Sequence, residues 1–267
     1  MNATLFVRTW RAQRTKLVAV TLALAGWGFV LPIVYASYGS QFRGLMDSGI
    51  IPKQLTQFGG GDIFSLSGSI SLGFIHPIAV ALNAVFAIGF TSAAVAGERQ
   101  RGTLEVILSR PISRRSVIVT LYAASVLFVS ITLAAFIVGS FTASVLWGVA
   151  DQLDASRLPG LWLNGILLYG AFGAVSLAAS VSFDRLTPVL GIALGVTIVS
   201  YFLDILGSLW PDARGLQPLS PFHYMKPNEV LAGTGSLGDL AVLVLVVAVS
   251  LAFALVRFPR RDIAAPS

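Results

Sequence analysis

Two long stretches without a charged side chain constrain this chain more than any other feature. No Asp, Glu, Lys or Arg occurs between Asp62 and Glu98, and none occurs between Arg115 and Asp151. Each stretch exceeds the roughly 20 residues that a helix needs to cross a bilayer, and backbone groups in lipid must bond within their own segment. Only 11% of the residues are charged, whereas soluble domains contain about a quarter. The sequence therefore predicts an all-α protein that crosses a membrane several times.

The apolar stretches predict six spans within a single transmembrane domain, residues 1–267. They lie at about residues 17–37, 72–96, 116–148, 160–183, 186–206 and 239–256. The first 16 residues place basic side chains opposite apolar ones, so we expect an interfacial elbow helix there; a disordered basic tail is the alternative. The apolar run that follows is long for a signal peptide, and we expect it to be retained as the first span.

The basic residues are distributed unevenly among the loops. Most of the 18 Lys and Arg residues lie in the N-terminal segment, the loop after the second span, the turn after the fourth span and the C-terminal tail. With six spans these four segments share one side of the membrane, and the positive-inside rule assigns that side to the cytoplasm. We therefore expect a multi-pass protein of the cell membrane with both termini cytoplasmic. The basic residues follow the span ends rather than one stripe, which argues against nucleic-acid binding.

The chain carries little that could support chemistry of its own. It has no Cys, which excludes disulfides, thiolate metal sites and cysteine nucleophiles. Its lysines follow Thr15, Pro52 and Met225, so none belongs to a Gly-x-x-x-x-Gly-Lys-Ser/Thr phosphate loop. No ionisable residue lies near the middle of a span, which disfavours a proton- or sodium-coupled transporter. We expect no catalytic residue, metal or cofactor in this chain, and no hydrolysis of ATP by it.

The charged loop at residues 97–115 has an internal order of its own. Gly102 can end the preceding helix, and Thr103 can cap a new one by accepting a backbone N–H bond. Pro111 ends that helix within about two turns, and Ser113 can cap the next span. Three apolar residues recur at i, i+3 and i+4 and share one face: Leu104, Ile107 and Leu108. The pattern predicts a short amphipathic helix at the membrane surface or in a partner's groove; a solvated loop is the alternative.

This loop resembles the one between the second and third spans of ABC-2 type permeases, the membrane subunits of ATP-driven exporters. The likeness rests on one ordered run: Glu98-x-x-x-Gly102-Thr103-Leu104-Glu105-x-x-Leu108-Ser109-x-Pro111-x-Ser113-Arg114. The tail Phe258-x-Arg260-Arg261-Asp262 is also similar to that family. One departure is the absence of a Lys that members often carry just inside the third span, where this chain has Leu121-Tyr122-Ala123.

The resemblance implies that the loop is a coupling helix docked into a cleft on a cytoplasmic ABC ATPase. It implies two copies of that ATPase, which would hold ATP and Mg²⁺, and a second permease copy that forms a homodimer or a pair with a similar permease. Polar docking contacts would come from Glu98, Arg99, Arg101, Thr103, Glu105 and Arg110, with Gly102 and Pro111 bounding the helix. Leu104, Ile107 and Leu108 would fill the cleft, and Asp184 and Arg185 would form a second, smaller contact.

Two other functions stay open on this basis. A non-transporting membrane scaffold could use the same loop to recruit a soluble protein, and ATP turnover that responds to cargo would separate it from a permease. A secondary transporter would need carboxylates or histidines along its path, and the spans have none at mid-membrane.

Overall fold

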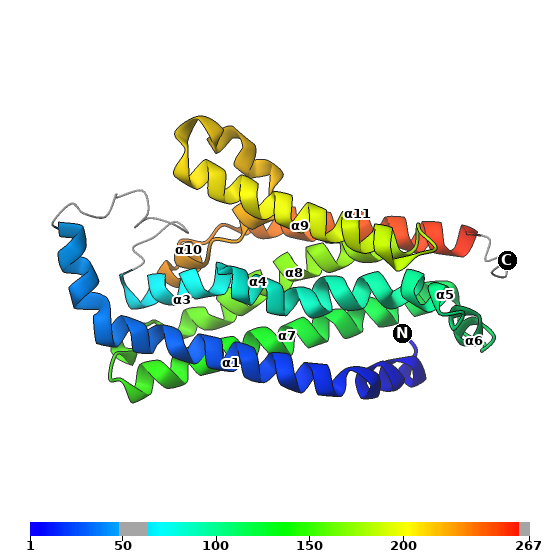
Figure 1. Cartoon of the computed structure of the whole chain (residues 1–267), viewed down its shortest axis with the longest axis horizontal. Coiled ribbons are helices and arrows are strands. Elements are labelled where there is room, and N and C mark those ends of the chain that lie inside the picture. Colours follow the sequence, from blue (N-terminus) through cyan, green and yellow to red (C-terminus); the bar gives the residue numbers. More distant parts are fainter. Residues whose placement is uncertain (48–63, 262–267) are drawn as a thin grey trace.

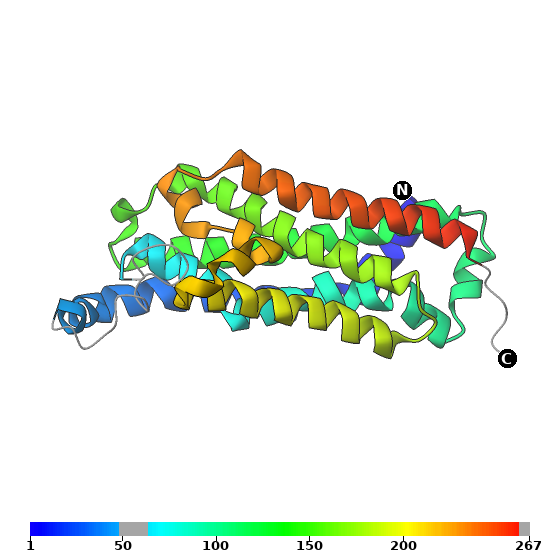
Figure 2. The ribbon, with the colours of Figure 1, turned by 90° about the horizontal axis from the view of Figure 1, so that it is seen from above.

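A computed structural model describes residues 1–47 and 64–261 of the chain. Long helices run side by side and form an elongated bundle (Figure 1). Within the described residues, five helices are long and apolar enough to cross a membrane, and there are six if the bent helix pair at residues 66–90 is counted as one span. The N-terminus and the last described residues lie at the same end of the bundle in both views (Figure 1 and Figure 2). The prediction of an all-α polytopic membrane protein is confirmed.

The first helix, α1 (Ala3–Asp47), is longer than predicted. Its basic N-terminal part does not form a separate elbow helix but continues without a break into the apolar span. No Gly or Pro precedes Gly26, so nothing interrupts the backbone hydrogen bonds at the expected boundary. α1 packs along α7 (Arg114–Leu146) at two positions without side chains: a Cβ at Gly28 or Gly139 would lie 2.2 Å from a carbonyl oxygen of the other helix.

The second span is a broken helix rather than the single helix predicted at residues 72–96. It begins with α3 (Leu66–Ile75), bends by 45° and continues through α4 (Pro77–Ala84). Proline has no N–H to donate and pushes the preceding residue out of the α region, so His76 takes φ −62° and ψ 145°. The Nδ1 atom of His76 accepts a backbone N–H of α4 at 3.2 Å. The His76-Pro77 pair therefore causes the bend.

The remaining long helices overlap the remaining predicted spans. They are α7, α8 (Leu158–Ser180), α9 (Leu186–Leu209) and α11 (Leu237–Arg260). Two short 3-10 turns, η3 (Ala150–Gln152) and η4 (Ala155–Arg157), connect α7 to α8. α8 packs against α7, α9 and α11, so it lies at the centre of the bundle.

Residues 210–236 lie beside the bundle, in the half away from the 97–115 loop (Figure 1). They form η5 (Pro211–Leu219), η6 (Pro221–Tyr224) and α10 (Pro227–Ala232), and η5 folds back against α9. The segment places His223 4.0 Å from Asp204 and Lys226 3.1 Å from Asp239. Burial acts to lower the pKa of Lys226, but the hydrogen bond and charge of Asp239 outweigh burial and raise it. The carboxylates near these span ends thus have cationic or ionisable partners.

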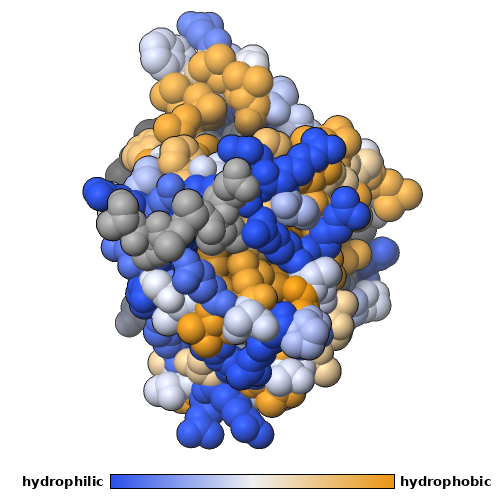
Figure 3. Space-filling view, turned by 90° about the vertical axis from the view of Figure 1, so that its right-hand side faces the viewer, coloured by the Kyte–Doolittle hydropathy of each residue, from blue (hydrophilic) through white to orange (hydrophobic). Residues whose placement is uncertain are grey.

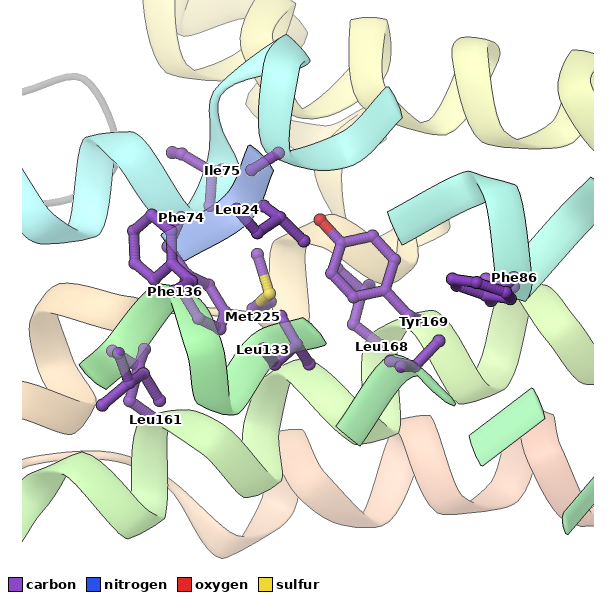
Figure 4. Close-up of a cluster of buried hydrophobic side chains, with 14 of the residues drawn as sticks. Leu24, Phe74, Ile75, Phe86, Leu133, Phe136, Leu161, Leu168, Tyr169 and Met225 are labelled. Atoms are coloured by element: carbon purple, nitrogen blue, oxygen red, sulfur yellow. The ribbon is translucent and has the colours of Figure 1, made fainter. Parts of the chain in front are cut away.

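Aromatic and aliphatic side chains fill the middle of the bundle (Figure 4). Phe74 of α3 meets Phe136 of α7 edge to face, with ring centroids 5.3 Å apart. Leu24 of α1 and Tyr169 of α8 are buried in the same cluster. Lipid is as apolar as these side chains, so close packing rather than removal from water holds the helices together. This core fixes the first half of the second span against α1, α7 and α8.

Candidate functional site

The predicted docking loop lies at one end of the bundle and contains two short helices, α5 (Glu98–Gln100) and α6 (Leu104–Leu108). Gly102 joins them with φ of 69°, in the left-handed region that residues with a side chain rarely adopt. Viewed from this end, hydrophilic side chains surround smaller hydrophobic areas (Figure 3). The short helix and the glycine break before it are therefore both present in the structure.

Thr103 does not make the capping bond expected of it. Its hydroxyl donates to the side-chain carboxylate of Glu98 at 2.6 Å and to the backbone carbonyl of Glu98 at 3.1 Å. Arg101 forms an ion pair with the same carboxylate. These bonds hold the hydroxyl beside Glu98, and α6 has no side-chain cap at its start. Glu98, Arg101 and Thr103 hold the α5–α6 turn in shape.

The apolar face of α6 points into this chain, which corrects the prediction that it fills a cleft on a partner. Leu104 and Ile107 are only 2% and 7% exposed. They belong to a buried cluster with Leu5 of α1 and Val117 of α7, and Leu108 is half-buried against it. Helical spacing correctly placed the three side chains on one face. It could not show that the bundle, which lies beside α6, would cover that face first.

The opposite face of α6 is open. Glu105 and Val106 are exposed, as are Ser109 and Arg110 just beyond the end of the helix, and 60% of Val106 is accessible. Across the described parts of the chain, neither Glu105 nor Arg110 takes part in an ion pair. Pro111 is exposed immediately beyond the helix. This outward face therefore offers an acid, a base and one apolar side chain, which suit a small apolar contact surrounded by charge pairs.

The two residues of the predicted second contact, Asp184 and Arg185, have different roles. Asp184 forms ion pairs with Arg99, at 2.9 Å, and with Arg261. Arg261 also donates to two backbone carbonyls just beyond α8, at 2.8 and 3.0 Å. Arg185 is exposed and makes no side-chain capping bond to α9. Asp184 thus ties the docking loop to the end of α11, and Arg185 is the member of the pair that remains open to a partner.

Two residues to which the sequence assigned no role complete this end of the bundle. The Gln100 side chain accepts the Leu186 N–H at 2.8 Å and joins α5 to the start of α9. The Arg114 guanidinium donates to three carbonyls at the end of α11, the shortest bond being 2.6 Å to Arg261. The last carbonyls of any helix lack internal partners, which makes a basic residue a natural cap. The sequence gives no indication of which helix end Arg114 would meet.

The helix that leads into the loop has unusual backbone geometry. Two stretches of it, η1 (Val85–Phe90) and η2 (Ala93–Gly97), are π-helical, a form found mostly as short insertions at functional sites. Serines of neighbouring helices bond to backbone groups of this region. Ser125 donates to the Phe86 carbonyl at 2.9 Å, Ser176 to the Ile88 carbonyl at 3.2 Å, and Ser180 to the Ser92 carbonyl at 2.7 Å.

Ser180 has a second task in the same region. Its oxygen accepts the backbone N–H groups of Val95 and Ala96, at 3.1 and 3.0 Å. A backbone group without a partner is costly where water is excluded, so these bonds stabilise the π form. The three serines, which we call the serine clamp (Ser125, Ser176 and Ser180), connect the approach to the docking loop with α7 and α8.

Comparison with known families agrees with this architecture. The family profile described as "ABC-2 family transporter protein" matches residues 11–263 and so spans the bundle from α1 to α11, including the docking loop. A comparison with curated proteins found no match. Members of this family are membrane components of ABC-type transporters and generally work with a cytoplasmic ATPase subunit. With the profile covering nearly the whole chain, the protein belongs to the ABC-2 family of transporter proteins.

Proposed function

We propose that this permease is the membrane subunit of an exporter and that the outward face of α6 docks onto a separate cytoplasmic ATPase. The observation that carries the proposal is the two-sided nature of α6. Its inner face is held in the bundle by Leu104 and Ile107, while Glu105, Val106 and Arg110 face away from the chain. A helix held in this way can transmit a displacement, because it cannot move without its supports.

The supports of α6 reach several helices. Its buried Leu104 and Ile107 belong to the cluster that α1 and α7 share, and Asp184 joins Arg99 to Arg261 at the end of α11. Movement of the loop would therefore act on both ends of the chain and on the second span. ATP and Mg²⁺ would bind to the ATPase, and its closure would switch the bundle between two facings.

We further propose an assembly of two ATPase copies with two permease copies, arranged as a homodimer, and outward transport. These features are inferred from the family resemblance. The orientation, with both termini and α6 in the cytoplasm, is supported by the excess of basic residues in the segments at that end. It is also supported by the N-terminus, α6 and the end of α11 lying together (Figure 1).

The test is retention of a partner ABC ATPase, sought among the genes that neighbour the permease gene. Both subunits are co-expressed, and the complex is purified through the permease at low and high salt. Arg110→Glu reverses a charge on the outward face of α6 and should reduce the ATPase recovered, most clearly at low salt. Arg14→Glu makes the same change on an exposed arginine of α1, outside the 97–115 loop, and should retain the ATPase. A wild-type permease that binds no ATPase, or equal losses from both variants, would refute the docking face.

A further inference from the structure

A groove of about 580 Å³ lies between the N-terminal part of α1, the π-helical part of the second span, α6 and the start of α7. Its wall is largely apolar and includes Phe90, Ala94 and Leu121, and it also contains Glu98 and Arg101, which form an ion pair with each other. Arg8 and Lys16 of α1 line the same groove and are exposed. Neither forms a hydrogen bond or ion pair with another residue in the described ranges 1–47 and 64–261. The groove thus combines two unpaired cations with an apolar surface.

The position of the groove along α1 matches the boundary between water and lipid. Lys16 directly precedes Leu17, where the apolar part of the helix begins. Arg8 lies eight residues earlier, about 12 Å along the helix axis. An ammonium group beside the apolar side chains of a span is costly unless an anion accompanies it. Basic pockets between spans at the cytoplasmic surface bind the headgroups of anionic lipids.

We propose that this groove binds one anionic phospholipid, with its phosphate between Arg8 and Lys16 and an acyl chain along the apolar wall. Gly89 makes room for the chain: a Cβ there would meet only the Ala84 carbonyl oxygen, at 3.8 Å. Ile107 of α6 also lines the groove, so the lipid would touch the helix that faces the ATPase. Placing this lipid in the cytoplasmic leaflet rests on the proposed orientation of the permease. The binding of the lipid to the groove does not.

The test titrates the purified full-length permease with phosphatidylglycerol or phosphatidylcholine and counts bound lipids by native mass spectrometry. Wild type should prefer phosphatidylglycerol. The double change Arg8→Gln with Lys16→Gln should weaken that binding about 25-fold, at about fivefold for each cation removed. The control double change Arg11→Gln with Arg14→Gln removes the same charge from exposed positions of α1 outside the groove and should keep affinity within about twofold.

A third variant keeps every charge. Gly89→Leu should occupy the space of the acyl chain and reduce phosphatidylglycerol binding, and it gives the answer if the Arg8 and Lys16 variant does not fold. Equal losses from the two charge variants would show a general attraction of α1 for anions and overturn the site. Wild-type binding by Gly89→Leu would also overturn it. The assay contains no ATPase, so its result is independent of the docking proposal.

Discussion

Val106 offers the sharpest test of which face of α6 binds the ATPase. The side chain is 60% exposed, whereas Leu104 of the same helix is 2% exposed. Fully burying a valine side chain contributes roughly 1.5–3 kcal/mol, so covering the exposed part in a docking cleft would contribute about 1–2 kcal/mol. Val106→Asp loses this contribution and adds a charge that must leave water. The affinity for the ATPase should therefore fall at least about five- to thirtyfold.

The measurement is the dissociation constant of labelled ATPase and purified permease, together with the melting temperature of the permease alone. Val106→Asp should leave the melting temperature unchanged because its side chain lies in solvent. Leu104→Ala should do the opposite: it removes a buried leucine and should cost the permease about 2–5 kcal/mol of stability. The two variants therefore separate docking from folding within one five-residue helix.

A matched control lies at the other end of the molecule. Leu216 of η5 is 43% exposed, so Leu216→Asp places the same charge at an exposed apolar position far from α6. It should bind the ATPase as wild type does. Wild-type affinity in Val106→Asp, or an unchanged melting temperature in Leu104→Ala, would refute the assignment of the two faces of α6.

Three other experiments examine the orientation and the ion pairs. In this chain without cysteine, Arg110→Cys should react with a membrane-impermeant thiol reagent only after cells are permeabilised, whereas Leu219→Cys, at a position 71% exposed, should react in intact cells; the reverse pattern would invert the topology. Asp184→Asn should lower the free energy of unfolding by no more than about 1 kcal/mol, and less at high salt, because this carboxylate is 59% exposed; a larger loss in denaturant titrations would contradict this. The pKa of Lys226 is raised above the ordinary 10.5, so its charge should stabilise the fold fully below pH 10.5 and lose that contribution as pH rises through the raised pKa. Above about pH 10 the melting temperature of the wild type should therefore fall faster than that of Lys226→Gln. Parallel curves would argue against the pair with Asp239.

The fold class could be predicted because each membrane span is recognised from the apolar character of its own residues. Long uncharged runs select helices whatever their neighbours are. Breaks within those helices are harder to predict. The His76-Pro77 pair signals a bend, yet the serines and the glycine between Leu66 and Ser71 gave no reason to expect a helix from Leu66. At the start of α1, basic side chains indicated an interfacial segment, but their backbone has no reason to break and continues into the span.

The sequence predicts that the candidate site contains a helix, but it does not predict which face of that helix points into the bundle. Spacing shows that Leu104, Ile107 and Leu108 share a face, whereas only the packing of α1 and α7 shows where that face points. The ion pairs of Asp184 also depend on how the helices pack and not on the local sequence. They join segments more than 70 residues apart in sequence, and no local pattern connects the Asp184 turn with Arg261. Sequence periodicity could not predict these contacts between distant segments of the site.

The π-helical stretches have a consequence for how chains of this kind can differ in length. A π turn closes its hydrogen bonds over one residue more than an α turn, so loss of a single residue within η1, or within η2, would restore α geometry in that stretch instead of unfolding the span. Such a deletion would rotate everything beyond it by about 100°, including the outward face of α6. A deletion in η1 would also displace the carbonyls of Phe86 and Ile88, to which Ser125 and Ser176 donate. Relatives that are one residue shorter in η1 should therefore have replaced Ser125 and Ser176 together, so that one gap in an alignment and two distant substitutions form a single inherited change.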